Sequence, residues 1–141
     1  MASVLLIGNG AREHAMAEAL VRSAAQPRLF ACMKANNPGI AALSREIHLG
    51  SYGDLNAIVA FARSSGVEFA VVGPEDPLNE RVVDALREAG IPSVGPTRDL
   101  ARLETSKSFT RDLVKKYGIP GNPRYRVFTA QKGLEPFLAE L

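Results

Sequence analysis

The chain has little cysteine, little histidine and no tryptophan: Cys32 is its only cysteine, and His14 and His48 are its only histidines. A single cysteine excludes an intramolecular disulfide framework and every zinc site built from several cysteines. Because Cys32 lies inside an apolar run, we expect a small core residue there rather than a nucleophile. No serine stands beside a convincing base, so we predict no catalytic triad. We assign neither a catalytic residue nor a metal ligand.

The sequence also lacks any apolar run near the roughly 20 residues that span a bilayer. Its N-terminus lacks the basic segment and apolar core of a secretion signal. We therefore expect a cytoplasmic protein with no membrane partner. Hydrophobic residues make up 46% of the chain, which suffices for one sizeable core, or one core and a small appendage.

The net charge of +2 conceals an uneven distribution of basic and acidic residues. Residues 1–97 hold eight Lys/Arg against ten Asp/Glu, whereas residues 98–141 hold nine against five. A basic segment is suited to nucleic acid when aromatic residues alternate with the basic ones. Here the aromatic residues fall at spacings that suit packing. We expect mostly solvated basic surface and no nucleic-acid partner.

Short apolar runs, separated by stretches with helical patterning, predict a parallel sheet. Most of the runs are continuous rather than alternating, as expected for strands that are covered on both faces. The alternation of strands and helices predicts an α/β fold, in which a Rossmann-like parallel sheet carries helices on both faces. The predicted strands are Val4–Ile7, Leu29–Cys32, Glu46–Leu49, Phe69–Val72 and Ser93–Val94.

Two of the intervening helices carry clear signals at their ends. Apolar residues at 55, 58, 59 and 62 form the stripe of one helix, which Asp54 caps and which ends before Gly66. The other helix has Asp76 as its N-cap and Pro77 as its first residue, and we predict that it runs to Gly90 without a break.

In a sheet of this kind, ligands bind beyond the carboxyl ends of the strands, where the strand order reverses. The loops at that end combine glycine with proline or repeat glycine, whereas the loops at the other end look like ordinary helix ends. This asymmetry favours a site at the carboxyl ends. The loops concerned are residues 8–12, 34–39, 73–77 and 95–97.

The loop after the first strand reads Gly-Asn-Gly-Ala-Arg-Glu-His-Ala over residues 8–15, directly before a predicted helix. Glycines let backbone N–H groups approach an anion, and the positive end of the helix dipole points to the same place. The loop therefore predicts phosphate binding. The alternative is a nicotinamide-dinucleotide-binding Rossmann module, although Glu13 stands where the third glycine of that fingerprint would fall, and no carboxylate ends the second strand.

Several ordered segments then resemble the glycinamide ribonucleotide synthetase family. They are Val-Leu-Leu-Ile-Gly-Asn-Gly-Ala-Arg-Glu-His-Ala at 4–15, Asn-Pro-Gly at 37–39, Val-Val-Gly-Pro-Glu-Asp-Pro-Leu at 71–78 and Val-Gly-Pro-Thr at 94–97. Leu-Glu-Thr-Ser-Lys-Ser-Phe-Thr-Arg-Asp at 103–112 and Tyr-Gly-Ile-Pro at 117–120 are similar to the family's entry into its ATP-grasp region. The chain departs from the family at Ala11, often a glycine there, and at residues 35–40, often Pro-Gly-Asn-Ala-Gly.

The resemblance implies a carbon–nitrogen ligase of de novo purine biosynthesis. Such a ligase joins 5-phosphoribosylamine and glycine through a glycyl phosphate, with ATP and Mg²⁺ or Mn²⁺, and yields glycinamide ribonucleotide, ADP and phosphate. In the family, the metal-binding carboxylates come later than residue 141. The resemblance therefore implies that this chain is an N-terminal fragment without ligase activity of its own.

The resemblance also implies a domain organisation. Residues 1–104 would form the substrate-binding domain that precedes the ATP-grasp fold. Residues 105–141 would hold the connecting helix and the first strand and helix of a truncated ATP-grasp domain. Lys107 matches the lysine that contacts ATP phosphates in the family, and a lysine suits a polyphosphate as a mobile point charge.

For the 5-phosphate of the sugar, we expect the backbone N–H groups of Asn9, Gly10 and Ala11 with the forked guanidinium of Arg12. The carboxylate of Glu75 is expected to bind ribose hydroxyls or the substrate amine. Structural alternatives stay open for Arg12, as an exposed side chain, and for Glu13, as an acceptor of a hydrogen bond from its own loop. The complete predicted substrate set is Gly8, Asn9, Gly10, Ala11, Arg12, Glu13, Asn37, Gly39, Gly73, Pro74 and Glu75.

Overall fold

A computed structural model describes residues 1–141, which divide into two compact units, Met1–Ala101 and Arg102–Leu141. The N-terminal unit is built on a five-stranded sheet with the order β3-β2-β1-β4-β5, and every strand pair is parallel. This arrangement confirms the predicted α/β fold. The strands are β1 (Ser3–Ile7), β2 (Arg28–Met33), β3 (Glu46–Leu49), β4 (Phe69–Val72) and β5 (Ser93–Val94).

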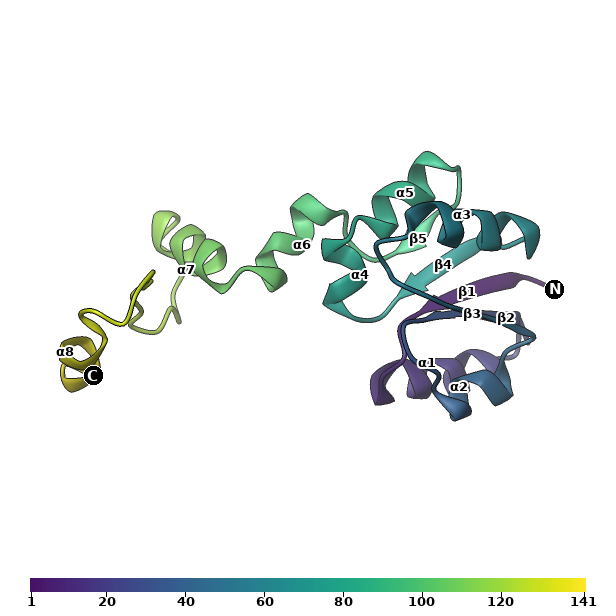
Figure 1. The fold of residues 1–141 in the computed structure, drawn as a ribbon, viewed down its shortest axis with the longest axis horizontal. Coiled ribbons are helices and arrows are strands. Elements are labelled where there is room, and N and C mark those ends of the chain that lie inside the picture. The colour runs from purple at the N-terminus through teal and green to yellow at the C-terminus, as the bar shows by residue number, and fades with distance from the viewer. The chain divides into compact units, whose positions relative to one another are not determined.

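Helices cover both faces of the sheet, with α1 and α2 on one face and α3, α4 and α5 on the other (Figure 1). At least one helix stands between every two successive strands, as the crossover connections of a parallel sheet require. The helices of this unit are α1 (Ala11–Arg22), α2 (Pro38–Leu43), α3 (Leu55–Ser64), α4 (Glu75–Asn79) and α5 (Val82–Glu88), with α6 (Arg98–Thr105) crossing the boundary between the units.

The central strand β1 separates two apolar clusters. Its side chains alternate between the two faces of the sheet, so Leu6 packs with α1 and α2 while Leu5 and Ile7 pack toward α3 and α5. All three side chains are fully buried. The core of the N-terminal unit thus lies on both sides of β1, which explains why its sequence is a continuous apolar run.

The strand order reverses between β1 and β4. The chain proceeds from β1 outward to β2 and β3, and then returns to place β4 on the other side of β1. The loops that follow these two strands begin at Gly8 and Gly73, whose N–H groups donate to Cys32 and Ile7 carbonyls at 3.0 Å in both cases. A topological switch point of this kind brings two loops together beside a ligand-sized gap.

The helix predicted from the stripe at 55–62 is confirmed as α3. Asp54 caps it, because its Oδ1 accepts the N–H of Ala57 at 3.0 Å. The helix ends at Ser64, two residues before Gly66, whose φ of 61° lies in the left-handed region.

The uninterrupted helix predicted over residues 77–89 is wrong. The structure has α4 from Glu75, with Pro74 rather than Asp76 at the N-cap, and then a separate α5. Pro77 is accommodated in the first turn of α4, where its missing N–H has no intrahelical acceptor to lose. The break comes at Arg81, which has a φ of 67° in the left-handed region. No glycine or proline at this position of the sequence indicates such a break. The expected terminator Gly90 does follow α5, at a φ of 82°.

Cys32 is a core residue, as predicted. Its side chain is buried in β2, and burial raises the pKa of its thiol to about 12. The thiolate that reacts with electrophiles and metals is therefore scarce at neutral pH.

The second unit contains α7 (Lys107–Lys116) and α8 (Leu134–Ala139). Neither helix has a buried residue, and apolar side chains such as Ile119 and Val127 are about half exposed. The expected first strand of an ATP-grasp domain is absent from residues 102–141. A strand is stable only when a neighbour pairs with it, and this unit offers none. No helix in either unit combines the length and apolarity needed to cross a membrane.

Candidate functional site

A cleft of about 380 Å³ opens at the switch point of the N-terminal unit. It collects residues from the carboxyl ends of four strands: the loop after β1, the start of the loop after β2, the loop after β3 and the loop after β4. The residues that line it are Asn9, Gly10, Arg12, Glu13, Lys34, Ala35, Tyr52, Pro74 and Asp76. The loop at 95–97, also expected at this end of the sheet, lines a different cavity beside α5.

Helix α1 begins at the edge of this cleft. Gly10 is its N-cap, and Ala11 and Arg12 are its first two residues. No acceptor in the chain takes the N–H groups of Asn9, Ala11 and Arg12. Free N–H groups and the positive end of the helix dipole make such a terminus attractive to anions.

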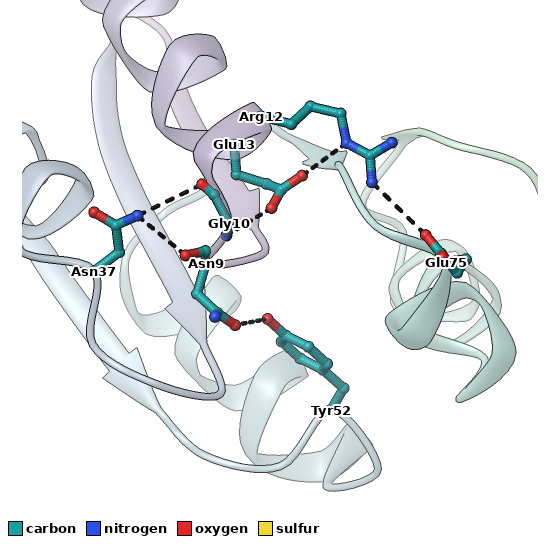
Figure 2. Close-up of polar contacts among 7 residues, drawn as sticks. All are labelled: Asn9, Gly10, Arg12, Glu13, Asn37, Tyr52 and Glu75. Carbon is teal, nitrogen blue, oxygen red and sulfur yellow. Dashed lines mark hydrogen bonds and ion pairs between the residues drawn. The ribbon is translucent and has the colours of Figure 1, made fainter.

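The side chain of Glu13 turns back toward the start of its own helix. Its Oε2 accepts the N–H of Gly10 at 2.8 Å, and its Oε1 accepts the Nε–H of Arg12 at 3.2 Å (Figure 2). Glu13 is only 3% exposed, although it is charged. The structural alternative for Glu13, a hydrogen bond from its own loop, is therefore present. It also means that the Gly10 N–H, which we expected to bind phosphate, already has an acceptor.

Arg12 lies between two carboxylates. Besides its contact with Glu13, its Nη2 is 3.7 Å from Oε2 of Glu75 at the start of α4 (Figure 2). Both Arg12 and Glu75 are more than half exposed, so this second contact adds little to stability. The two carboxylates hold the guanidinium between the start of α1 and the start of α4. Its other N–H groups remain free to donate to a ligand.

Asn37 joins the loop after β2 to the loop after β1. Its Nδ2 donates to the carbonyl of Asn9 at 3.0 Å, while its Oδ1 caps α2 by accepting the N–H groups of Gly39 and Ile40 (Figure 2). Both ends of the amide are thus used within the protein. This geometry gives Asn37, which we expected to contact substrate, the role of tying the loop after β2 to the loop after β1.

Substituting Asn37 separates these two contacts. Asn37→Ala removes both and should lower the free energy of unfolding by about 1–2 kcal/mol, as the loss of an N-cap does. Asn37→Asp keeps the cap acceptor but cannot donate to Asn9. We expect Asn37→Asp to keep most of the stability in a urea titration and to alter the amide NMR signals of residues 9–12. Equal destabilisation by both variants would contradict the assignment of the cap.

Sequence reasoning did not assign four residues that the structure brings into the cleft: Lys34, Ala35, Tyr52 and Asp76. The hydroxyl of Tyr52 donates to Oδ1 of Asn9 at 2.8 Å (Figure 2). Burial raises the pKa of this hydroxyl, so it stays protonated and able to donate at neutral pH. Lys34 is exposed and has no ion pair within the chain. The position of Lys34 directly after β2 could have indicated a place in the cleft. Tyr52 had no such signal, because it reaches the cleft from the loop after the edge strand β3.

Three of the remaining predicted residues, all glycines, pack against side chains and do not line the cleft. Gly8 and Gly73 adjoin Glu13, and Gly39 adjoins the ring of His14, so that a Cβ atom at any of the three would collide with these side chains. Pro74 lines the cleft. Lys107 belongs to the other unit, where it is the exposed first residue of α7.

No group of three or more His, Cys, Asp and Glu side chains is arranged to hold a metal ion. The divalent cation that the resemblance implies therefore finds no fitting site in these residues, and no chemical step is assigned through it.

The phosphoribosylglycinamide synthetase N-domain family matches residues 2–104 of this chain. Curated relatives carry the name phosphoribosylamine–glycine ligase. The one from Methanocaldococcus jannaschii is 48% identical over 139 residues, which make up 98% of this chain and 31% of that protein. The one from Methanococcoides burtonii is 43% identical over 139 residues, or 99% of this chain and 32% of that protein.

The chain thus spans about a third of the length of the curated relatives it matches. Among solved structures, the ADP complex of an N5-carboxyaminoimidazole ribonucleotide synthetase superposes with a TM-score of 0.78 at 21% identity. The match covers 99% of this chain and 35% of that one. A likeness at this identity establishes the fold.

Proposed function

Because the chain belongs to the phosphoribosylglycinamide synthetase N-domain family, we propose that it forms the N-terminal part of a ligase joining 5-phosphoribosylamine to glycine. Within that ligase, the N-terminal unit binds the phosphorylated sugar in the switch-point cleft. The observation that carries this assignment is the start of α1, where the N–H groups of Asn9, Ala11 and Arg12 have no acceptor in the chain and where Asn9 and Arg12 line the cleft.

The 5-phosphate is assigned to the N–H groups of Asn9, Ala11 and Arg12 and to the free guanidinium N–H groups of Arg12. Gly10 contributes shape rather than a donor, since its N–H is held by Glu13. Lys34, which also lines the cleft, supplies a second positive charge. An Arg fork gives geometric specificity for a phosphate, whereas a lysine acts as a point charge.

The ribose and its amine extend toward the loop after β4. Glu75 lies at the start of α4 with its carboxylate beside Arg12, where it can accept hydrogen bonds from ribose hydroxyls or from the amine. Placing the amine in this way is the unit's contribution to catalysis. Ligation then needs positioning and charge neutralisation rather than an activating triad, because an amine is already a competent nucleophile.

ATP is assigned to the region that begins after residue 104, and Lys107 is proposed to contact its phosphates. Support comes from the family resemblance around 103–112 and from the ADP bound by a protein of the same fold. In the complete enzyme, ATP would phosphorylate the glycine carboxylate, and the sugar amine would displace phosphate from the glycyl phosphate. This is a cytoplasmic step of purine biosynthesis. The 141-residue chain alone is expected to release no phosphate from ATP with glycine and phosphoribosylamine.

Calorimetric titration of the chain with glycinamide ribonucleotide tests the proposal. We expect saturable binding of one ligand per chain. The rival assignment, a nicotinamide-dinucleotide module, predicts instead that NADH fluorescence changes on mixing with the chain. A response to NADH without heat from glycinamide ribonucleotide would overturn the proposal in favour of that rival.

A further inference from the structure

Glycines at the switch point surround a protein side chain rather than an empty space. A Cβ at Gly10 would lie 2.8 Å from Oε2 of Glu13, and a Cβ at Gly73 would lie 2.8 Å from its Cδ. A Cβ at Gly8 would lie 2.9 Å from the same Cδ. Gly66 and Gly90 differ, because nothing lies within 4 Å of a Cβ at either position. Three glycines from two loops therefore make room for one residue.

Glu13 needs such a place because it is a buried charge. A carboxylate removed from water is costly unless hydrogen bonds replace its hydration. Both oxygens of Glu13 have donors, the Gly10 N–H at 2.8 Å and the Arg12 Nε–H at 3.2 Å. Bulkier residues at 8, 10 or 73 would push the carboxylate away from these donors. The glycines are thus required for the carboxylate to reach both.

We infer that Glu13 is a positioning residue for Arg12, seated in a slot formed by Gly8, Gly10 and Gly73. The slot fixes the carboxylate, and the carboxylate fixes Nε of Arg12, so that the outer guanidinium N–H groups point to the phosphate. The three loop glycines make room for this internal carboxylate, while the N–H groups of Asn9, Ala11 and Arg12 stay available to the phosphate. The positioning role rests on the proposed function, whereas the slot does not.

A double-mutant cycle between residues 13 and 73 tests the slot. Gly73 is suited to it because its φ is not in the left-handed region, so that alanine adds bulk without backbone strain. We expect Gly73→Ala to lower the urea midpoint of the parent chain, and to lower it far less in the Glu13→Ala background, where the space is vacant. An equal fall in both backgrounds would overturn the slot.

One control variant and one folding criterion keep this cycle decisive. Gly53→Ala is the matched control, since its Cβ would lie at an ordinary 3.4 Å from the Glu80 carboxylate and its φ is also not positive. It should have the same small effect in both backgrounds. If Gly73→Ala alone fails to fold, folding of the double variant with Glu13→Ala supports the slot, and failure of both overturns it.

Ligand affinity tests the positioning role. Glu13→Gln keeps the size of the side chain, but an amide can accept only one of the two donors. We expect it to weaken glycinamide ribonucleotide binding about tenfold, and to have no further effect when Arg12 is already alanine. Equal weakening in both backgrounds would show that Glu13 acts independently of Arg12. No binding by the parent would overturn the proposed function and this role with it, while the urea midpoints still decide the slot.

Discussion

Replacing Arg12 by alanine is expected to weaken glycinamide ribonucleotide binding by about tenfold to a hundredfold, the equivalent of about 1.5–3 kcal/mol for hydrogen bonds to a charged group. The guanidinium is the one cation that lies both on the cleft and at the free N–H groups of α1. Its two carboxylate neighbours hold it in place without using all of its donors. Calorimetry on the folded variant measures the effect.

Arg22→Ala is the matched control for this prediction. Arg22 is an exposed arginine in the last turn of α1, at the other end of the helix from the cleft. Replacing it by alanine removes the same net charge as Arg12→Ala. Its loss should change the dissociation constant by less than about twofold, since charges beyond a Debye length of about 10 Å are largely screened. If both variants bind equally well, or lose affinity equally, the phosphate is not held by Arg12.

Leu5→Ala is expected to lower the free energy of unfolding of the N-terminal unit by about 3 kcal/mol, the usual cost of a cavity at a buried leucine. Leu5 is fully buried in the middle of the central strand, where it packs in the larger of the two apolar clusters. Strands β2 and β4 flank β1 on either side, so the surrounding backbone cannot easily collapse into the space. Urea denaturation followed by far-UV circular dichroism measures the change.

Leu49→Ala is the comparison, because Leu49 ends the edge strand β3 and is 51% exposed. A surface substitution of this kind should change stability by no more than about 0.5 kcal/mol. A similar loss in the two variants would mean that β1 is not the centre of the core.

The fold of the N-terminal unit follows from local patterns that are strong in this sequence. Continuous apolar runs predicted the positions of the strands. The cap at Asp54 and the glycine at residue 66 correctly predicted where α3 begins and ends. The break between α4 and α5 was missed because Arg81 adopts a left-handed conformation with no glycine to signal it. The ATP-grasp strand expected within residues 105–141 does not form, because pairing depends on a neighbouring strand and residues 102–141 supply none.

The site was predictable to the level of its loops but not of its contacts. The rule that ligands bind at the carboxyl ends of parallel strands pointed to Asn9, Arg12 and Glu75, which the structure places at the switch point. The contacts between residues far apart in the chain left no local pattern in the sequence from which they could be predicted. The hydrogen bond between Tyr52 and Asn9 joins residues 43 positions apart, and the tie from Asn37 to the carbonyl of Asn9 spans 28.

Glu13 shows the same limit most clearly. In the sequence it is an oddity of the glycine loop, since it replaces the third glycine of a dinucleotide fingerprint. In the structure its carboxylate occupies the space beside Gly8, Gly10 and Gly73, where a pyrophosphate would otherwise approach the backbone. A pyrophosphate that approached the backbone there would have to displace this side chain, so the residue argues against a dinucleotide more strongly than its position in the motif alone.

Amide NMR spectra of the chain, recorded during titration with ribose 5-phosphate and separately with ribose, test the central claim most directly. The account predicts that ribose 5-phosphate shifts the N–H signals of Asn9, Ala11 and Arg12 more than those of the rest of the chain, and that ribose leaves them in place. Shifts that are equal for the two sugars, or that fall outside the switch-point cleft, would contradict a phosphate site at the start of α1.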